Sequence, residues 1–145
     1  MSVRQLATAL RGAPAPLAAV DMDAARANAA SLVAAASGLP IRVASKSIRS
    51  TALIRKFLEI PGFRGVLAFT PAEAVHLADA GVDDLLIAYP SVDRGALATA
   101  ARHRSVIRPL IDSADHVRLL ADITQETNAP IPVCLDIDAG WRPLD

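Results

Sequence analysis

The feature that most constrains the fold of this chain is a regular alternation of short apolar runs with amphipathic segments. The apolar runs begin at intervals of roughly 20–25 residues and read "PLAAVDM" (16–22), "IRVASK" (41–46), "GVLAFT" (65–70), "DLLIAYP" (84–90), "SVIRPLID" (105–112) and "IPVCLDID" (131–138). Helical patterns occupy the segments between and after them, near 23–37, 50–59, 71–80, 93–103 and 113–127. Short runs that are apolar throughout are typical of strands covered on both faces. The alternation therefore predicts right-handed βαβ units and a parallel sheet.

Local signals support several of these boundaries. Residues that favour the start of a helix stand at Asp23, at Thr70-Pro71 and at Ser113. Gly38 and Gly81 follow helical patterns, where a left-handed residue ends a helix. A further short helix is expected at 3–11, followed by the proline-rich link "GAPAP". We therefore divide the chain into an N-terminal helix and linker, 1–15, and a main domain, 16–145.

The order of elements fits two kinds of parallel sheet. Doubly wound sheets and (β/α)8 barrels share this local pattern, but winding in one direction without a glycine-rich phosphate loop favours the barrel. A complete barrel needs eight strands and about 250 residues, whereas this chain has 145 residues and six predicted strands. We therefore predict an α/β protein of TIM-barrel type, present as an N-terminal portion with five to six βα units. A small open α/β sheet, complete as it stands, is the alternative.

Composition narrows the class of partner. Fifteen basic and fifteen acidic residues give no net charge, and aromatic residues make up 3% of the chain. Neither value favours nucleic acid or an anionic membrane as a partner. A single cysteine excludes an intrachain disulfide and a cysteine-based metal cluster. The first residues contain no long apolar run and no apolar run of membrane-spanning length follows, so we expect neither a signal peptide nor a membrane span. A cytoplasmic protein that acts on a small molecule is the expectation.

Lys46 stands out because the chain has only two lysines, Lys46 and Lys56, against thirteen arginines. Strand alternation predicts that Arg42 and Lys46 share one face and that Ile41, Val43 and Ser45 share the other. The apolar face would pack on helices, so Lys46 would lie at the carboxyl end of a strand, where barrel enzymes carry their chemistry. A desolvated lysine near a second cation can attack a carbonyl to form a Schiff base. The alternative is a lysine that simply reaches solvent at a strand end.

A family resemblance bears on this choice. Residues 16–46, "PLAAVDMDAARANAASLVAAASGLPIRVASK", resemble the start of the fold-type III pyridoxal phosphate enzymes, which include alanine racemase, D-threonine aldolase and D-serine dehydratase. In that group an "(I/V)DLDAL..N" opening precedes a helix, and the next strand ends in the lysine that binds the cofactor as a Schiff base. The resemblance implies that Lys46 is this lysine and that pyridoxal 5'-phosphate (PLP) is the cofactor.

The rest of the chain extends the resemblance and also departs from it. "FTPAEAVHLADAGVDDLLIAYP" is similar to a family block of the form "(S)xxEAxxLxxAGxxDILxxxP", and "LDIDAGWR" is similar to "DxGxxR" with Arg142 one residue early. The aldolase and dehydratase branch typically reads "RPHxKTHK" at the lysine strand, where this chain has "RVASKSIR". That form is closest to proteins called amino acid deaminase/aldolase. The departures affect the expected reaction more than the expected cofactor.

Other residues are candidates for contacts with the cofactor or substrate. Arg42 either orients the cofactor ring or forms an ion pair with an inward carboxylate such as Asp136. Ser47 and Arg49 follow the lysine, where a hydroxyl and a guanidinium could meet a phosphate or a substrate carboxylate. Each could equally serve the structure alone, Ser47 as a helix lead-in and Arg49 as a solvated cation.

Two further strand ends carry polar groups. Tyr89, the only tyrosine, could bound or hydrogen-bond the cofactor, whereas Thr70 is expected to cap a helix. Asp138 could act with Asp136 in acid–base chemistry or could form a turn. By resemblance, Arg142 would approach the pyridine ring or its phenolic oxygen.

The remaining titratable residues are predicted to be structural. No pair among His76, His103 and His116 has the spacing of metal ligands, and Glu73 opens a helix, where a carboxylate suits the dipole. The resemblance implies that any divalent metal of the full-length protein is held by ligands outside this chain.

The resemblance implies a PLP-dependent lyase that acts on a D-amino acid, by aldol cleavage of a β-hydroxy amino acid or by dehydration and deamination. The alternatives are a non-catalytic PLP-binding protein, an amino acid racemase, and a barrel fragment without cofactor. The 145 residues alone are expected to have little or no activity. The resemblance also implies a homodimer.

Overall fold

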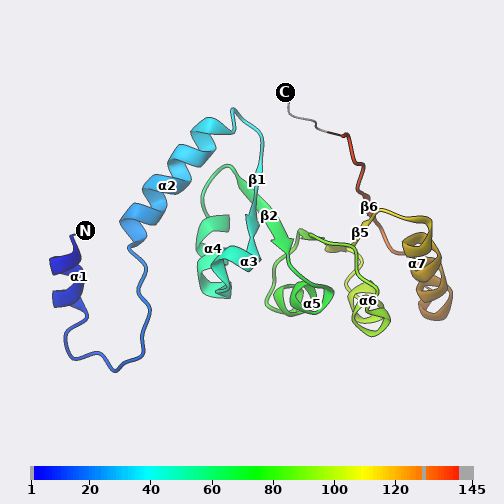
Figure 1. Ribbon diagram of the computed structural model, residues 1–145, viewed down its shortest axis with the longest axis horizontal. Helices are drawn as coiled ribbons and strands as arrows, with labels where there is room; N and C mark the ends of the chain where they lie inside the picture. Colours follow the sequence, from blue (N-terminus) through cyan, green and yellow to red (C-terminus); the bar gives the residue numbers. More distant parts are fainter. Residues whose placement is uncertain (1, 129, 141–145) are drawn as a thin grey trace. The chain divides into compact units, whose positions relative to one another are not determined.

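In the computed structural model of the protein, residues 2–128 and 130–140 are described (Figure 1). The chain divides into two compact units, residues 1–40 and 41–145.

The N-terminal unit contains two helices, α1 (Val3–Ala9) and α2 (Met22–Ala35). Asp21 caps α2, and its carboxylate accepts hydrogen bonds from the backbone N–H groups of Asp23 and Ala24, both at 3.1 Å. The predicted strand 16–22 is therefore wrong: its last two residues belong to the start of the helix. Within the described part of this unit no segment pairs with residues 16–20, and an extended segment becomes a strand only where a neighbour completes the ladder. The predicted N-cap at Asp23 lies two residues too late.

The second unit is built on a parallel sheet in which the order of the strands follows the chain. The strands β1 (Ile41–Ala44), β2 (Phe63–Ala68), β3 (Leu85–Ile87) and β4 (Ile107–Arg108) pair in that order, each parallel to its neighbour. A second parallel pair joins β5 (Leu110–Ile111) to β6 (Cys134–Leu135). The helices between and after these strands are α3 (Ser45–Ile48), α4 (Thr51–Leu58), α5 (Pro71–Asp79), α6 (Arg94–Ala101) and α7 (Ala114–Thr127) (Figure 1).

This arrangement confirms the predicted α/β class and parallel sheet. Winding in one direction, with each strand beside its predecessor, is the arrangement of a barrel rather than of a doubly wound sheet. The predicted strand 105–112 is interrupted at Pro109, which has no N–H for the ladder. Its carbonyl oxygen still accepts a hydrogen bond from the N–H of Cys134 at 2.9 Å. The predicted strand 131–138 is formed only at Cys134–Leu135.

The core lies on one face of the sheet, between the strands and the helices. Alternate strand residues Val66, Leu85 and Ile107 are at most 1% exposed and pack with residues of α4 and α5 such as Ile54 and Leu77. A second cluster joins α6 and α7 to β5 through Leu97, Ala101, Ile111, Leu120 and Ile123. On the opposite face Leu67 and Leu86 are half-buried. Strand alternation thus separates a helix-covered face from a face that would be the interior of a barrel.

Several predicted helix boundaries are confirmed. Thr70 caps α5 with Pro71 as its first residue, and Ser113 caps α7. Gly38 and Gly81 both have positive φ angles after helices. No helix in the described part of the chain is long and apolar enough to cross a membrane.

Candidate active site

Lys46 lies in a short helix directly after β1, rather than in the strand itself. The strand ends at Ala44, and α3 begins at Ser45. The prediction that strand alternation places Lys46 on the Arg42 face is therefore wrong, because the alternation stops two residues before the lysine. Lys46 nevertheless lies at the carboxyl end of β1, which is the end where a parallel barrel carries its functional loops.

The amine of Lys46 contacts Tyr89. Its Nζ donates a hydrogen bond to the Tyr89 hydroxyl oxygen at 2.6 Å and lies 5.1 Å from the centroid of the ring. Tyr89 follows β3 and is 47% exposed. An ammonium this close to an aromatic ring is also attracted by the negative potential of its face. Two loops from non-adjacent strands thus meet at the lysine amine.

Phe69, after β2, lies beside this pair. Its ring and that of Tyr89 have centroids 5.8 Å apart and an interplanar angle of 88°. This edge-to-face packing is one of the favourable arrangements for aromatic pairs. Lys46, Phe69 and Tyr89 therefore form one cluster, with one residue from each of the loops that follow β1, β2 and β3.

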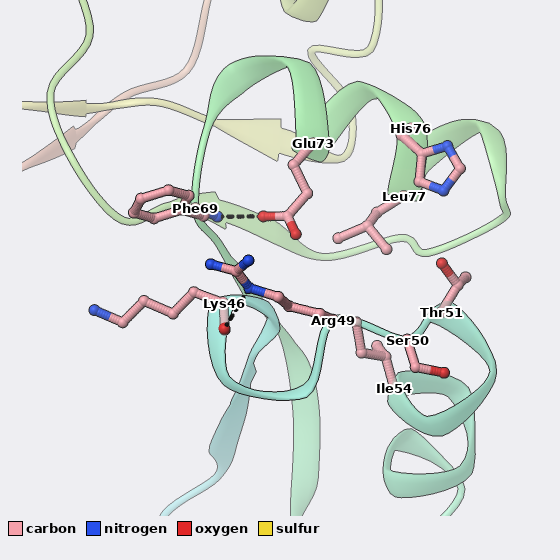
Figure 2. A pocket seen from close by; sticks show the side chains of 9 residues that line it. All are labelled: Lys46, Arg49, Ser50, Thr51, Ile54, Phe69, Glu73, His76 and Leu77. Carbon is pink, nitrogen blue, oxygen red and sulfur yellow. Dashed lines mark hydrogen bonds between the residues drawn. The ribbon is translucent and has the colours of Figure 1, made fainter. Parts of the chain in front are cut away.

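Arg49 ends α3 in a left-handed conformation, with φ 48°. Its Nε donates to the carbonyl oxygen of Lys46 at 3.1 Å, and its terminal nitrogens have no protein partner among the described residues. Arg49, Phe69 and Glu73 line one cavity, and in Figure 2 the Lys46 side chain extends away from the other labelled residues. Residues in or beside α3, α4 and α5 line this cavity of about 430 Å³. They are Lys46, Arg49, Ser50, Thr51, Ile54, Phe69, Glu73, His76 and Leu77.

Glu73 and Ser45 connect the segment that follows β1 to the segment that follows β2. Ser45 is completely buried, and its hydroxyl lies 2.7 Å from Oε2 of Glu73 and 3.2 Å from the carbonyl oxygen of Leu67. The same Oε2 accepts a hydrogen bond from the backbone N–H of Phe69 at 2.7 Å (Figure 2). Hydrogen bonds to a carboxylate are among the stronger ones in proteins. The sequence placed Ser45 on the helix-facing side and Glu73 in the first turn of a helix, but the 28 residues between them hid the contact.

Arg42 lies at the other end of the sheet. Its Nη1 forms an ion pair with Oδ1 of Asp84 at 2.9 Å, so the carboxylate partner is Asp84 rather than the predicted Asp136. Arg64 and Arg108 also approach Asp84, at 3.8 and 3.7 Å. These residues surround the amino ends of the strands and do not meet Lys46. Arg42 therefore does not join the cluster at the carboxyl end.

The other predicted site residues are scattered. Ser47 is exposed on α3 beside Lys46 but does not line the cavity. Thr70 caps α5 by accepting from the N–H of Glu73. Asp138 accepts a hydrogen bond from the N–H of Gly140 at 2.8 Å, as expected for a turn. Arg142 lies outside the described residues.

Asp136 and Asp138 also border a second, open cavity of about 630 Å³ with Asp112. Within the described residues, no group of three or more His, Cys, Asp or Glu side chains is placed to hold a metal ion. His116 contacts Asp112 and Ser113 instead, and His103 contacts Asp79. Of the three histidines, only His76 lines the cavity beside Lys46.

Comparison with known proteins identifies the fold and the family. The family described as alanine racemase, N-terminal domain, matches residues 20–142. The crystal structure of D-threonine aldolase from Filomicrobium marinum superimposes with a TM-score of 0.77 and 24% sequence identity, over 88% of this chain and 35% of that chain. This chain thus spans about a third of the aldolase it matches. No curated protein sequence matches it.

The structural match supports the interpretation of the parallel sheet as the N-terminal portion of a barrel of this type. The family match extends over most of the chain, from before α2 to beyond β6. The chain therefore belongs to the alanine racemase N-terminal domain family.

Proposed function

We propose that the full-length protein is a PLP-dependent lyase that acts on a D-amino acid, with Lys46 as the lysine that binds the cofactor. The observation that carries this proposal is the lysine amine at the carboxyl end of β1, hydrogen-bonded to the Tyr89 hydroxyl. Among the described residues it has no carboxylate partner. An amine in such a place is available for reaction with an aldehyde. Membership of the family supports the class of cofactor.

The side chains around Lys46 suit the chemical groups of PLP, which has an aldehyde, an aromatic ring and a phosphate. The Lys46 amine is the partner for the aldehyde. Tyr89 and Phe69 provide an aromatic surface beside it, and Arg49 provides a guanidinium whose terminal nitrogens can bind an anion. Ser47, Asp138 and Arg142 remain proposed contacts on the basis of the family resemblance. Arg42 is left out because Asp84 holds it at the opposite end of the strands.

When bound, the cofactor supplies an electron sink for bonds at the substrate Cα. The chain's own residues would then handle the proton and the orientation. The Lys46 amine, once it is not attached to the cofactor, is positioned to take or return a proton at Cα. The Tyr89 hydroxyl would hold that amine at the carboxyl end of the strands, and the Arg49 guanidinium would attract the phosphate or a substrate carboxylate.

Two reactions fit this arrangement. Aldol cleavage breaks the Cα–Cβ bond of a β-hydroxy amino acid, and dehydration removes the β-hydroxyl to give a keto acid and ammonia. The similar fold of a D-threonine aldolase supports aldol cleavage of a β-hydroxy amino acid. A small amino acid as substrate and a homodimer as the assembly are also proposed on the basis of the family.

The test uses the full-length protein, because this chain spans only 35% of the aldolase it resembles. PLP is added, visible absorbance is recorded, and D-serine and D-threonine are then supplied in separate samples. We expect a visible band that changes on addition of substrate, with aldehyde release from D-threonine or ammonia release from D-serine. A band that neither amino acid changes would instead support a non-catalytic PLP-binding protein. Interconversion of D- and L-amino acids would support a racemase, and absence of a band would contradict the cofactor assignment.

A further inference from the structure

We propose that Glu73 is a positioning residue for Lys46. Its carboxylate closes a ring of contacts that runs from Lys46 through Ser45, Glu73, Phe69 and Tyr89 back to the lysine amine. The inference concerns the conformation of Lys46, and its importance for catalysis rests on the proposed function.

The first half of the ring fixes the lysine backbone. Ser45 directly precedes Lys46 and has no exposed surface. Its hydroxyl lies 2.7 Å from the Glu73 carboxylate, which comes from α5, 28 residues further along the chain. Because the peptide that leads into Lys46 is bound in this way, the lysine side chain leaves α3 from a fixed position.

The second half fixes the partner of the lysine amine. The carboxylate oxygen that contacts Ser45 also accepts from the N–H of Phe69 at 2.7 Å. The Phe69 ring packs edge-to-face on Tyr89, and the Tyr89 hydroxyl accepts from Lys46 Nζ at 2.6 Å. The Glu73 carboxylate therefore positions both the backbone at Lys46 and Phe69. Phe69 in turn supports Tyr89, whose hydroxyl accepts the hydrogen bond from the lysine amine.

Capping of α5 alone does not explain this use of a carboxylate. Thr70 is the N-cap and already accepts from the N–H of Glu73 at 3.1 Å. In a capping box the glutamate would return to the N–H of the N-cap residue. Glu73 instead accepts from the N–H of Phe69, which precedes the N-cap residue, and contacts the Ser45 hydroxyl from α3. Its contacts thus link two loops that both carry residues of the candidate site.

The experiment compares Glu73→Ala with Glu73→Gln and Ser45→Ala in the full-length protein. The control is Glu126→Ala, which removes an exposed carboxylate paired with Arg94 on the surface. Formaldehyde and a mild reductant methylate the amines, and mass spectrometry gives the ratio of labelling at Lys46 to labelling at Lys56. Lys56 is an internal reference because it is exposed and paired only with Glu59 in the described chain. Unfolding curves for each variant identify samples that have lost the fold.

In the wild-type protein we expect the Lys46 to Lys56 labelling ratio to differ from one, because Tyr89 holds the Lys46 amine. Glu73→Ala should move the ratio toward one, as for two solvated amines, and Tyr89→Phe should move it in the same direction. The double variant Glu73→Ala/Tyr89→Phe should add little, because residues that act through one network are not additive. Glu73→Gln should keep a ratio near that of the wild type, since its amide oxygen can accept both hydrogen bonds. Ser45→Ala should have an intermediate effect, and Glu126→Ala none. An unchanged ratio in folded Glu73→Ala protein would overturn the proposal, because a purely structural role would alter only the unfolding curve.

A second arm measures the PLP concentration at half-saturation of the visible band. We expect Glu73→Ala to raise it about tenfold, the change that corresponds to the loss of one hydrogen bond to a charged group. If the wild-type protein forms no band, the proposed function fails, while the formaldehyde ratio still decides whether Glu73 positions Lys46. If the band forms equally well in all variants and the ratios are equal, only the role of Glu73 fails.

Discussion

The basic side chains at the two ends of the parallel strands have different kinds of partner. At the amino end, Arg42, Arg64 and Arg108 all lie within 3.8 Å of the Asp84 carboxylate. At the carboxyl end, the contacts of the Lys46 amine within the described part of the chain are with the Tyr89 hydroxyl and the Tyr89 ring. An amine that is not held in an ion pair can react with a carbonyl group. The guanidinium of Arg42, in contrast, forms an ion pair with Asp84. The comparison separates an end that serves stability from an end that is suited to chemistry, as in other barrels of parallel strands.

The largest effect on the amino end is expected from Gly65→Ala. Gly65 has φ +71°, and an added Cβ would lie 2.3 Å from Arg42 Nη1 and 2.7 Å from the carbonyl oxygen of Asp84. A backbone carbonyl cannot move aside as a side chain can, so we expect destabilisation of about 2–4 kcal/mol. Chemical denaturation of the full-length protein measures it.

Gly95→Ala is the matched control for that change. Gly95 lies in α6, and the nearest atom to its added Cβ would be Asp93 Oδ1, at 3.7 Å. Helix propensity then predicts a gain of about 0.5–1 kcal/mol in the free energy of unfolding. Equal losses in the two variants would show that Gly65 is not needed for the close packing of Arg42 and Asp84.

A smaller effect is expected from Asp84→Asn. The substitution leaves three arginines near a neutral side chain that is 20% exposed in the wild type. We expect a loss of about 1–2 kcal/mol in the free energy of unfolding, which decreases as salt screens the repulsion between the guanidinium groups. Unfolding curves at low and high salt test this. PLP binding should stay at the wild-type level, and its loss would break the separation between the two ends.

The smallest effect on stability is expected from Tyr89→Phe at the carboxyl end. The hydroxyl is lost while the ring that packs on Phe69 is kept, and the side chain is 47% exposed. We expect a change in unfolding free energy below about 0.5 kcal/mol. The PLP concentration at half-saturation should rise about fivefold, because the hydrogen bond that holds the Lys46 amine is removed. A large loss of stability with unchanged PLP binding would reverse the roles assigned to Tyr89.

The sequence was sufficient to predict the class of fold and most helix boundaries, because periodicity and capping residues are local signals. The start of α5 at Thr70-Pro71 is an example. It did not predict that 16–22 lacks a strand, because a short apolar run does not by itself specify a strand. Nor did it predict that α3 begins at Ser45, since a turn of helix directly after β1 leaves no clear periodicity.

The candidate site was predicted in part. Lys46 and Tyr89 were both placed at strand ends from the pattern alone, and the structure brings them together. The partner of Arg42 is 42 residues away and the partner of Ser45 is 28 residues away. Contacts over such separations depend on strand register, which a single sequence does not specify. For this reason Asp84 and Glu73 were missed as the residues that hold the two ends.

The most direct test of the account is to map the lysine that carries the cofactor in the full-length protein. The protein is incubated with PLP, reduced with borohydride and digested, and the modified peptide is identified by mass spectrometry. We predict that the label is found on Lys46, that Lys46→Ala abolishes both the label and the visible band, and that Lys56→Ala changes neither. A label on another lysine, with Lys46 unmodified in the folded wild-type protein, would contradict the central claim that the amine beside Tyr89 is the reactive one.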